Sequence, residues 1–422
     1  MPLGFSKSIF SKGASSTGAD WAAWDGSNDS TYDIDTLHGV SNTTEQWLGF
    51  CSFSDTHGIA ASVSGHGSGT EKTITYHVLK NTSDTVTATS RVTGISTGSN
   101  SYGGTANHQR GFLVPTNGGN ILSSWGNSAS NDTQLVSISG DTLTAHTAFN
   151  AGSLGGDSRT QWIFRRPGTN VYNVLPDGKR LGYKMTLTEN GNSSSAAIGA
   201  DIIVGSNSDF YYKGRTFPGH VDANTMLMST GTDNSAIQPI KIEFDETGSQ
   251  TAGTFSGPPN ANLAGVWSDY GGVGSGIDQS PYSGQPPYPT TDFNDTMLFF
   301  SHGGGGGDGN GSKKLHCFAY KAGEANFSSS NTITVSAGTV SDLHMTGCFV
   351  GPDNDVFLMS IIQAATDSLV VFKYILSTNT LSEVFRIAKG SDWNIEQARL
   401  ARWGDDRAVL FYDDDKIRLL TA

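Results

Sequence analysis

The chain has 422 residues and a formal net charge of −13, although only 15% of its residues are charged. Such an excess of carboxylates leaves no basic surface for phosphate groups, which argues against a nucleic-acid partner and against an anionic membrane surface. The three cysteines include no CxxC pair, so neither a disulfide framework nor a zinc site is expected. We expect Cys51, Cys317 and Cys348 to be buried thiols, with a Cys51–Cys348 bridge as the alternative.

The N-terminal segment divides into two parts that precede any repeated pattern. Residues 1–20 form an arm of Ser, Gly and Lys punctuated by Phe5, Ile9 and Phe10. Its apolar run is too short and too broken for a signal peptide, and no segment of the chain approaches a transmembrane span. Residues 21–46 are an irregular, strand-bearing lead-in. We expect the arm to anchor the protein to a neighbouring protein, or else to tuck its apolar side chains under its own fold.

From residue 47 to residue 422 one pattern recurs: a small turn residue, an apolar run, a polar loop and a second apolar run. The copies start at His57, Asn120, Val171, Asn224, Asp295, Asp355 and Asp406. Their spacing of roughly 50 to 70 residues is near the period of four-stranded propeller blades with lengthened loops. Helical periodicity is nearly absent, apart from one helical turn near Asn394. The pattern predicts an all-β, single β-propeller with seven blades; six or eight blades, or a stack of β-sandwich domains, are the alternatives.

The last two copies show how the ring is expected to close. Between Asp353 and Gly390, three apolar runs are separated by short polar turns, so the strands must pair antiparallel. The next copy, which starts near Arg399, stops at Ala422 one strand short. A ring of sheets hides its end sheets only if that strand is supplied. We therefore expect the lead-in of residues 21–46 to complete the last blade.

The fifth copy carries a long insertion. Residues 265–293 are rich in Gly, Pro and Tyr and show no strand pattern, and loops of this length inside a domain are usually functional or disordered. Its candidate surface-recognition residues are Trp267, Tyr270, Tyr282 and Tyr288. Their aromatic rings suit stacking on sugars or docking on a protein, and the alternative is that they pin the loop to the ring. The Gly-rich stretch 302–312 lacks the Lys of a phosphate-binding loop, so nucleotide binding is not expected.

The sequence shows no constellation with catalytic or metal-binding spacing. GISTG at Gly94–Gly98 matches the nucleophile-elbow pattern, but no helix can follow it. The ten histidines are scattered singly, and none lies at a metal-motif spacing. Arg165, Arg166 and Arg180 do not reproduce the arginine cluster of sialidase-type propellers and are expected to pair with carboxylates. We therefore expect no catalytic residues, no cofactor and no metal ion.

The opening MPLGFSKSIFSKGAS resembles the N-termini of structural proteins of marine tailed bacteriophages, particularly phages of cyanobacteria. The resemblance covers only these residues. It implies a non-enzymatic virion surface protein, either a capsid-decorating or knob protein or a tail-tip or fibre component. It also implies synthesis in the cytoplasm of the infected host and assembly into the virion without secretion. The expected partners are other virion proteins, with a host-surface glycan and further copies of the chain as additional candidates.

Two further hypotheses come from other functional classes. A carbohydrate-active propeller enzyme, such as a lyase or a glycosidase, would need two carboxylates that converge in the central channel. Asp201 and Asp342, near expected strand ends, are the candidates for such a pair. A lectin-like binding module is the third hypothesis.

Overall fold

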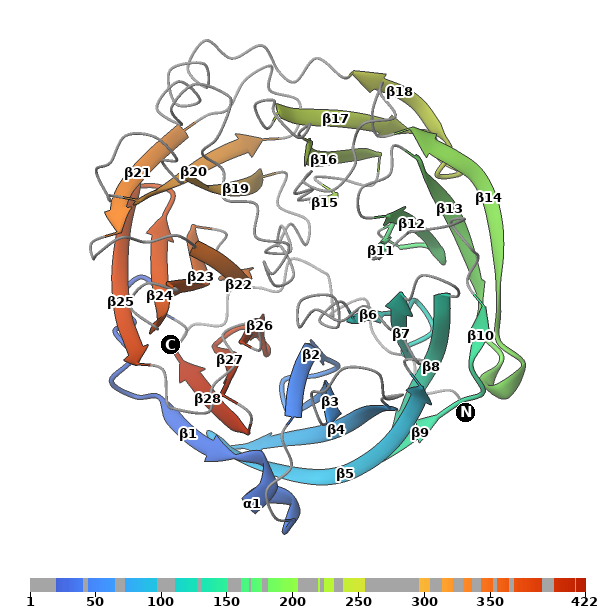
Figure 1. The fold of residues 1–422 in the computed structure, drawn as a ribbon, viewed down its shortest axis with the longest axis horizontal. Coiled ribbons are helices and arrows are strands. Elements are labelled where there is room, and N and C mark those ends of the chain that lie inside the picture. Colours follow the sequence, from blue (N-terminus) through green and yellow to red (C-terminus); the bar gives the residue numbers. More distant parts are fainter. Residues whose placement is uncertain are drawn as a thin grey trace, which may run out of the picture.

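The computed structural model describes most of the repeated region and part of the lead-in. The described residues are 20–40, 45–64, 73–96, 111–126, 131–150, 161–166, 168–176, 181–203, 219–220, 224–230, 238–254, 296–303, 313–321, 329–335, 343–351, 355–363, 368–388, 398–413 and 415–422. They form β-sheets arranged in a ring, and in the first five sheets the first strand lies innermost and the last strand at the rim (Figure 1).

The sheets follow one another round the ring in chain order. The first sheet contains β2 (Glu45–Ser52), β3 (His57–Ser64), β4 (Thr73–Thr82) and β5 (Thr85–Ser96). The second contains β6 (Gly111–Pro115), β7 (Ile121–Gly126) and β8 (Asn131–Ser139), and both β9 (Thr142–Ala145) and β10 (Phe149–Asn150) pair with β8. The third contains β11 (Gln161–Arg165), β12 (Val171–Pro176), β13 (Leu181–Thr188) and β14 (Ser195–Ile203). The fourth contains β15 (Gly219–His220), β16 (Thr225–Thr230), β17 (Gln238–Phe244) and β18 (Gln250–Thr254). The fifth contains β19 (Thr296–Gly303), β20 (Lys313–Lys321) and β21 (Ser329–Val335).

The sixth sheet has eight strands and consists of two halves. One half contains β22 (Leu343–Val350), β23 (Val356–Gln363), β24 (Ser368–Ile375) and β25 (Thr380–Ala388). The other contains β26 (Arg399–Arg402), β27 (Arg407–Tyr412), β28 (Lys416–Thr421) and β1 (Ser30–Asp33). The halves meet at a single parallel pair, Gly347 with Leu400. The count of seven blades stays a prediction, because the six hydrogen-bonded sheets give seven units only when this sheet is divided at that pair.

The N-terminal strand completes the last set of strands, as predicted. β1 pairs antiparallel with β28, from Ser30 opposite Leu419 to Asp33 opposite Lys416. No single hydrogen-bonded sheet runs round the ring among the described residues. The ring therefore closes where residues from near the start of the chain add a strand to residues at its end. The chain is thus an all-β propeller in which an N-terminal strand completes the last sheet.

The strand sequences reflect burial on both faces of a sheet. In β24, SLVVFKYI, the first five residues are all buried, because neighbouring sheets cover both faces. The rim strand β25, TLSEVFRIA, contains no fully buried residue and carries charges. Cys51 lies in β2 as a buried thiol, which agrees with the prediction and decides against the alternative bridge to Cys348.

The apolar core lies between neighbouring sheets rather than within one layer. Ile59 and Tyr76 of the first sheet share a cluster with Ile121 and Val136 of the second. Similar clusters join the second sheet to the third, the last four strands to the first sheet, and the two halves of the sixth sheet. The sheets that share these clusters are therefore stabilised by their neighbours in the ring.

One short helix was not predicted from the sequence. α1 (Ile34–His38) follows β1 directly; the Asp33 side chain accepts a hydrogen bond from Thr36 N at 2.8 Å, and Gly39 ends the helix at φ 66°. Five residues are too few to show helical periodicity, which is why the pattern analysis missed it. A 3₁₀ turn, η2, lies at Gly191–Ser193. No helix among the described residues has the length and apolar content needed to span a membrane.

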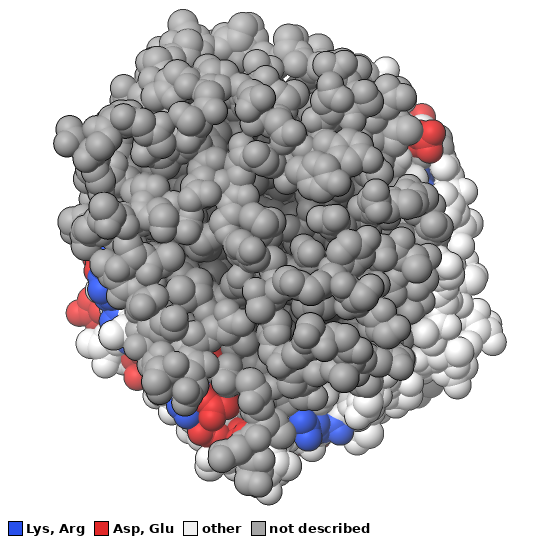
Figure 2. Space-filling view, viewed as in Figure 1, with Lys and Arg blue, Asp and Glu red and all other residues white. Residues whose placement is uncertain are grey.

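Charged side chains of both signs adjoin one another at the rim, on the side where β25, β28 and β1 lie (Figure 2). The predicted arm, with Phe5, Ile9 and Phe10, lies outside the described residues. So do residues 265–293 and the helical turn expected near Asn394.

Candidate functional site

Two groups of polar side-chain contacts stand out among the described residues. One lies in the closing segment after the arm, and the other joins neighbouring sheets. We call residues 20–33 the latch, because they fasten the N-terminal part of the chain to the strands β23–β28. Trp21 and Trp24 are 2% and 5% exposed and pack edge to face at 5.6 Å in the core between β23–β24 and β26–β28. Trp21 Nε1 also donates a hydrogen bond to Asp405 O at 3.0 Å. These two side chains anchor the segment by apolar burial.

Asp29 is the electrostatic centre of the latch. Its side chain is 1% exposed; Oδ1 accepts from Trp24 Nε1 at 3.0 Å and Oδ2 accepts from Arg418 Nε at 2.8 Å. The Arg418 guanidinium lies 3.9 Å from the centre of the Phe385 ring, so it is sandwiched between a carboxylate and an aromatic face. Burial raises the pKa of Asp29, although Trp24 and Arg418 counteract it. The carboxylate thus links the latch to β28 and, through Arg418, to β25.

Two further cations hold the latch at its ends. Lys373 Nζ donates to the backbone oxygens of Ala22 and Trp24, at 2.6 and 2.8 Å. Lys416 Nζ lies 2.8 Å from Asp33 Oδ2, and hydrogen bonds from Lys416 and Thr36 lower the pKa of Asp33 to about 2. Basic side chains from two strands therefore meet carbonyl and carboxylate oxygens supplied by the latch.

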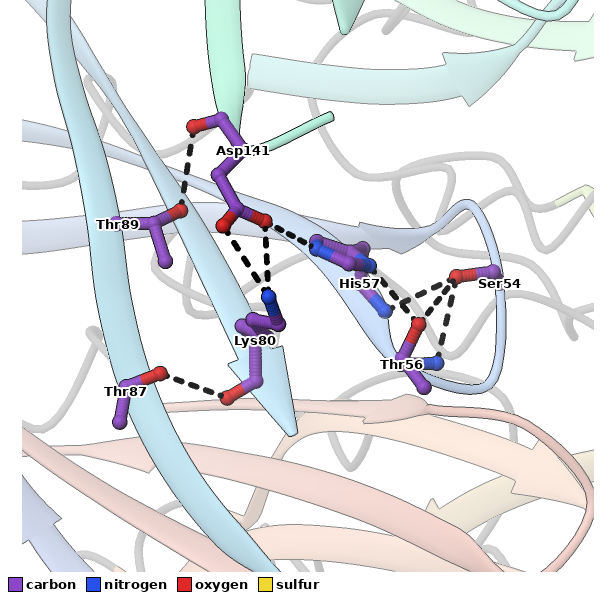
Figure 3. A network of polar contacts seen from close by, with 7 residues as sticks. All are labelled: Ser54, Thr56, His57, Lys80, Thr87, Thr89 and Asp141. Carbon is purple, nitrogen blue, oxygen red and sulfur yellow. Dashed lines mark hydrogen bonds and ion pairs between the residues drawn. The ribbon is translucent and has the colours of Figure 1, made fainter. Parts of the chain in front are cut away.

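The second feature is a contact that recurs between neighbouring sheets. Asp141 lies in the two-residue turn between β8 and β9, where the preceding Gly140 has φ 60°. Its Oδ1 lies 2.7 Å from His57 Nε2 at the start of β3, and its Oδ2 lies 3.1 Å from Lys80 Nζ in β4 (Figure 3). Hydrogen bonds from His57 and Lys80 lower the pKa of Asp141. An acid of the second sheet is thus bound by two bases of the first.

The same placement recurs at two other joints. Glu189, which follows β13 of the third sheet, accepts from Thr116 Oγ1 and Asn120 Nδ2, both at 2.7 Å, in the turn between β6 and β7. Asp84, in the turn between β4 and β5, lies 2.6 Å from Arg407 Nε at the start of β27. In each case the acid lies in the turn before the outer strand of one sheet. It contacts the preceding sheet of the ring, at the start of that sheet's second strand or in the turn just before it. We call these three contacts the clamps.

The clamp at Asp141 includes a hydroxyl, an imidazole and a carboxylate. Thr56 Oγ1 lies 2.9 Å from His57 Nδ1, so hydroxyl, imidazole and carboxylate stand in the order of a hydrolase triad (Figure 3). However, the ammonium of Lys80 contacts both Asp141 oxygens, and such a cation opposes the formation of an imidazolium next to it. The Asp141 side chain is also 47% exposed, where water weakens its effect on the ring. The cluster is therefore best explained as a joint between sheets.

The nucleophile-elbow pattern has a packing explanation. Gly94 lies in β5, and a Cβ at this position would be 2.2 Å from Cε2 of Tyr76. Tyr76 is fully buried, and its hydroxyl donates to Gln134 Oε1 of the second sheet at 3.1 Å. Ser96 is the last residue of the strand. The glycine makes room for an aromatic ring, which gives it a role in packing.

The inward carboxylate pair expected for an enzyme is not supported at Asp201. This residue lies in β14, the last strand of the third sheet, and it is exposed at the rim (Figure 1). The expectation that it points into the channel is wrong, because the repeat places the fourth strand of a sheet outermost. Asp342 lies outside the described residues, as do Trp267, Tyr270, Tyr282 and Tyr288. Within the described ranges, no three His, Cys, Asp or Glu side chains are grouped so as to hold a metal ion.

The clamps and the buried contacts of Trp21, Trp24 and Asp29 in the latch were not predicted, although the sequence holds a signal for the clamps. An acid or amide recurs in the turn before the last strand of a copy, as in Asp84-Thr85, Asp141-Thr142 and Asn379-Thr380. Such residues are favoured in turns for conformational reasons alone. Which basic or hydroxyl group each acid meets depends on the neighbouring sheet, which a single copy does not reveal.

Comparison with known proteins adds little beyond the architecture. No protein-family model and no curated sequence matches the chain. A catalytically inactive virginiamycin B lyase from Staphylococcus aureus, solved with quinupristin, is 10% identical, with a TM-score of 0.46 over 94% of this chain and 100% of the lyase. The Nup133 β-propeller domain from Vanderwaltozyma polyspora is also 10% identical, with a TM-score of 0.47 over 93% of this chain and 98% of that domain. The WD40 domain of SCAP from fission yeast is 8% identical, with a TM-score of 0.38 over 93% of this chain and 98% of that domain. These similarities assign no activity to the chain.

Proposed function

We propose that this protein is a non-enzymatic structural component of a virus particle of the tailed-bacteriophage type. It acts as a capsid-decorating or knob protein or as a tail-tip or fibre component. The arm of residues 1–20 attaches it to other virion proteins through Phe5, Ile9 and Phe10, and the ring carries the exposed surface. The proposal rests on the resemblance of the first residues and on one structural observation, the latch.

The latch supports the proposal because the arm runs directly into it. A segment that ties a protein to a particle transmits every displacing force to the residues that follow it. Here those residues are Trp21, Trp24 and Asp29, whose side chains are buried against strands of the sixth sheet. A force on an attachment at this position would act on a buried core and a buried ion pair rather than on a surface loop. The same segment closes the ring, so attachment and folding share one element.

The test is incorporation into particles during assembly. Deletion of residues 1–15 leaves the latch intact, so the truncated protein should fold with unchanged β-sheet content yet fail to incorporate. Replacing Phe5, Ile9 and Phe10 together by Ser should have the same effect. Replacing Ser6, Ser8 and Ser11 by Ala is the matched control and should leave incorporation at the wild-type level. Normal incorporation of the truncated protein would rule out anchoring by the arm.

The proposal extends to host-surface glycans through the segment of residues 265–293. Tyr282→Ala with Tyr288→Ala should abolish binding to host polysaccharide if these rings stack on sugars, whereas particle incorporation should not change. Release of sugars from that polysaccharide by the wild-type protein would instead favour the carbohydrate-active enzyme. Binding without release and without incorporation would favour a lectin-like module.

A further inference from the structure

The helix α1 contacts the first sheet through the buried side chain of Ile34 and through a pair of histidines. His38, the last residue of α1, places Nε2 3.0 Å from Nδ1 of His77 in β4. His77 is 1% exposed, and its Nε2 lies 2.7 Å from Ser62 Oγ in β3. The Trp47 ring lies 5.6 Å from the His77 ring, centre to centre. A polar chain thus leads from the buried interior of the first sheet to the end of the helix that continues the closing strand.

The bond between the two imidazoles depends on how many protons they hold. One proton between Nε2 of His38 and Nδ1 of His77 makes the hydrogen bond, and a neutral imidazole has one nitrogen to donate and one to accept. When both rings are protonated, each presents an N–H to the other. The hydrogen bond is then lost, and two positive charges face each other across 3.0 Å.

The surroundings of the pair disfavour the protonated rings. Burial, the neighbouring His38 and Arg91 all lower the pKa of His77 well below its usual value. Burial and Arg91 likewise lower the pKa of His38, whereas Asp35 of α1 raises it. Ser62 and Trp47, which complete the surroundings, are uncharged. At the other end of α1 the charges are Asp33, Asp415 and Lys416, and Lys416 is paired with both acids.

We propose that the His38–His77 pair is an acid-sensitive fastening that releases α1 from the first sheet, while β1 stays paired with β28. The two ends of the closing segment respond differently because their titrating groups differ. Hydrogen bonds from Lys416 and Thr36 hold the pKa of Asp33 at about 2, so that ion pair persists where histidines titrate. Residues 34–40 would then separate from the first sheet, which exposes the buried Ile34 side chain, without opening the seam between β1 and β28.

The sign of the pH dependence follows from proton uptake. When α1 is docked on the first sheet, protonation of the two rings is disfavoured. At pH values between the lowered pKa values of the docked state and the ordinary histidine pKa, the released state therefore binds more protons. Docking is therefore complete above the ordinary histidine pKa of about 6.5 and is lost as the pH falls below it. For each proton taken up, the equilibrium constant for release rises up to about tenfold per pH unit.

Hydrogen exchange of the full chain at several pH values, read by mass spectrometry, tests this inference. After correction for the intrinsic pH dependence, protection of Ile34–Val40 should be constant above about pH 7 and fall up to about tenfold per pH unit per proton below about pH 6.5. Protection of β27 should not change over the same range. Constant protection of Ile34–Val40 down to about pH 5, or parallel loss in β27, would overturn the proposal.

A pair of variants separates these histidines from other titrating groups. His38→Gln keeps an N–H donor for His77 but cannot take up a proton, so the pH slope of exchange in α1 should decrease by about one proton. His146→Gln is the control, because His146 contacts Ser137 and Asn192 at a different joint and should leave the slope in α1 unchanged. A wild-type slope in His38→Gln would contradict the assignment. If that variant does not fold, the wild-type exchange profile alone still decides.

Discussion

At the scale of single residues, Asp29 is the side chain on which the closing segment depends most. A carboxylate that is 1% exposed is unfavourable unless its oxygens are bonded, and here both are. Arg418, its cationic partner, is itself held against Phe385. Removing the charge of Asp29 would therefore leave a partly buried guanidinium without its counter-charge. The other acids of the same segment lie nearer the surface.

Replacing Asp29 by Asn should lower the free energy of unfolding by about 3 kcal/mol, because one partner of a buried ion pair is removed while the shape is kept. Urea unfolding followed by tryptophan fluorescence measures the change. Asp25→Asn is the matched control in the same segment. Asp25 is exposed and bonds to Ser27 N at 2.9 Å, so this variant should unfold near the wild-type urea concentration. Equal midpoints for the two variants would show that the Asp29–Arg418 pair does not stabilise closure.

At the scale of elements, strand positions followed from the sequence, whereas contacts between sheets did not. Predicted copies starting at His57, Asn224 and Asp355 match β3, β16 and β23, because burial on both faces produces apolar runs bounded by polar turns. α1 has only five residues, so its pattern is too short to recognise. The clamps at Asp84, Asp141 and Glu189 join different sheets, and a contact of that kind depends on the order and rotation of the sheets in the ring.

Gly94 gives a prediction about how β5 packs on its sheet. Gly94→Ala should lower the free energy of unfolding by about 2 kcal/mol, because the new methyl group overlaps the buried Tyr76 ring, which its hydrogen bond to Gln134 holds in place. The control is Gly49→Ala in β2, where no atom lies within 4 Å of the added Cβ. Thermal unfolding of both variants measures the difference. A loss of stability in Gly49→Ala as large as in Gly94→Ala would argue against the packing explanation.

At the scale of the whole molecule, the ring is closed by a segment that is distant in sequence from the strands it completes. The sequence predicted this closure because the last copy lacks a strand, and β1 on β28 confirms it. It did not predict that residues before β1 bury two tryptophans, because Trp21 and Trp24 belong to no repeat. The candidate anchor residues Phe5, Ile9 and Phe10 and the aromatic residues of the long insertion stay predictions. Their roles depend on partners that a single chain does not contain.

The most direct test of this account is the stability of two N-terminal truncations. Removal of residues 1–19 deletes the proposed anchor and should leave the free energy of unfolding unchanged. Removal of residues 1–40 also deletes the latch, β1 and α1. It should cost about 6 kcal/mol or prevent folding, at roughly 2 kcal/mol for each buried side chain of Trp21, Trp24 and Ile34. A protein that lacks residues 1–40 and unfolds like the full chain would contradict closure of the ring by its N-terminal segment.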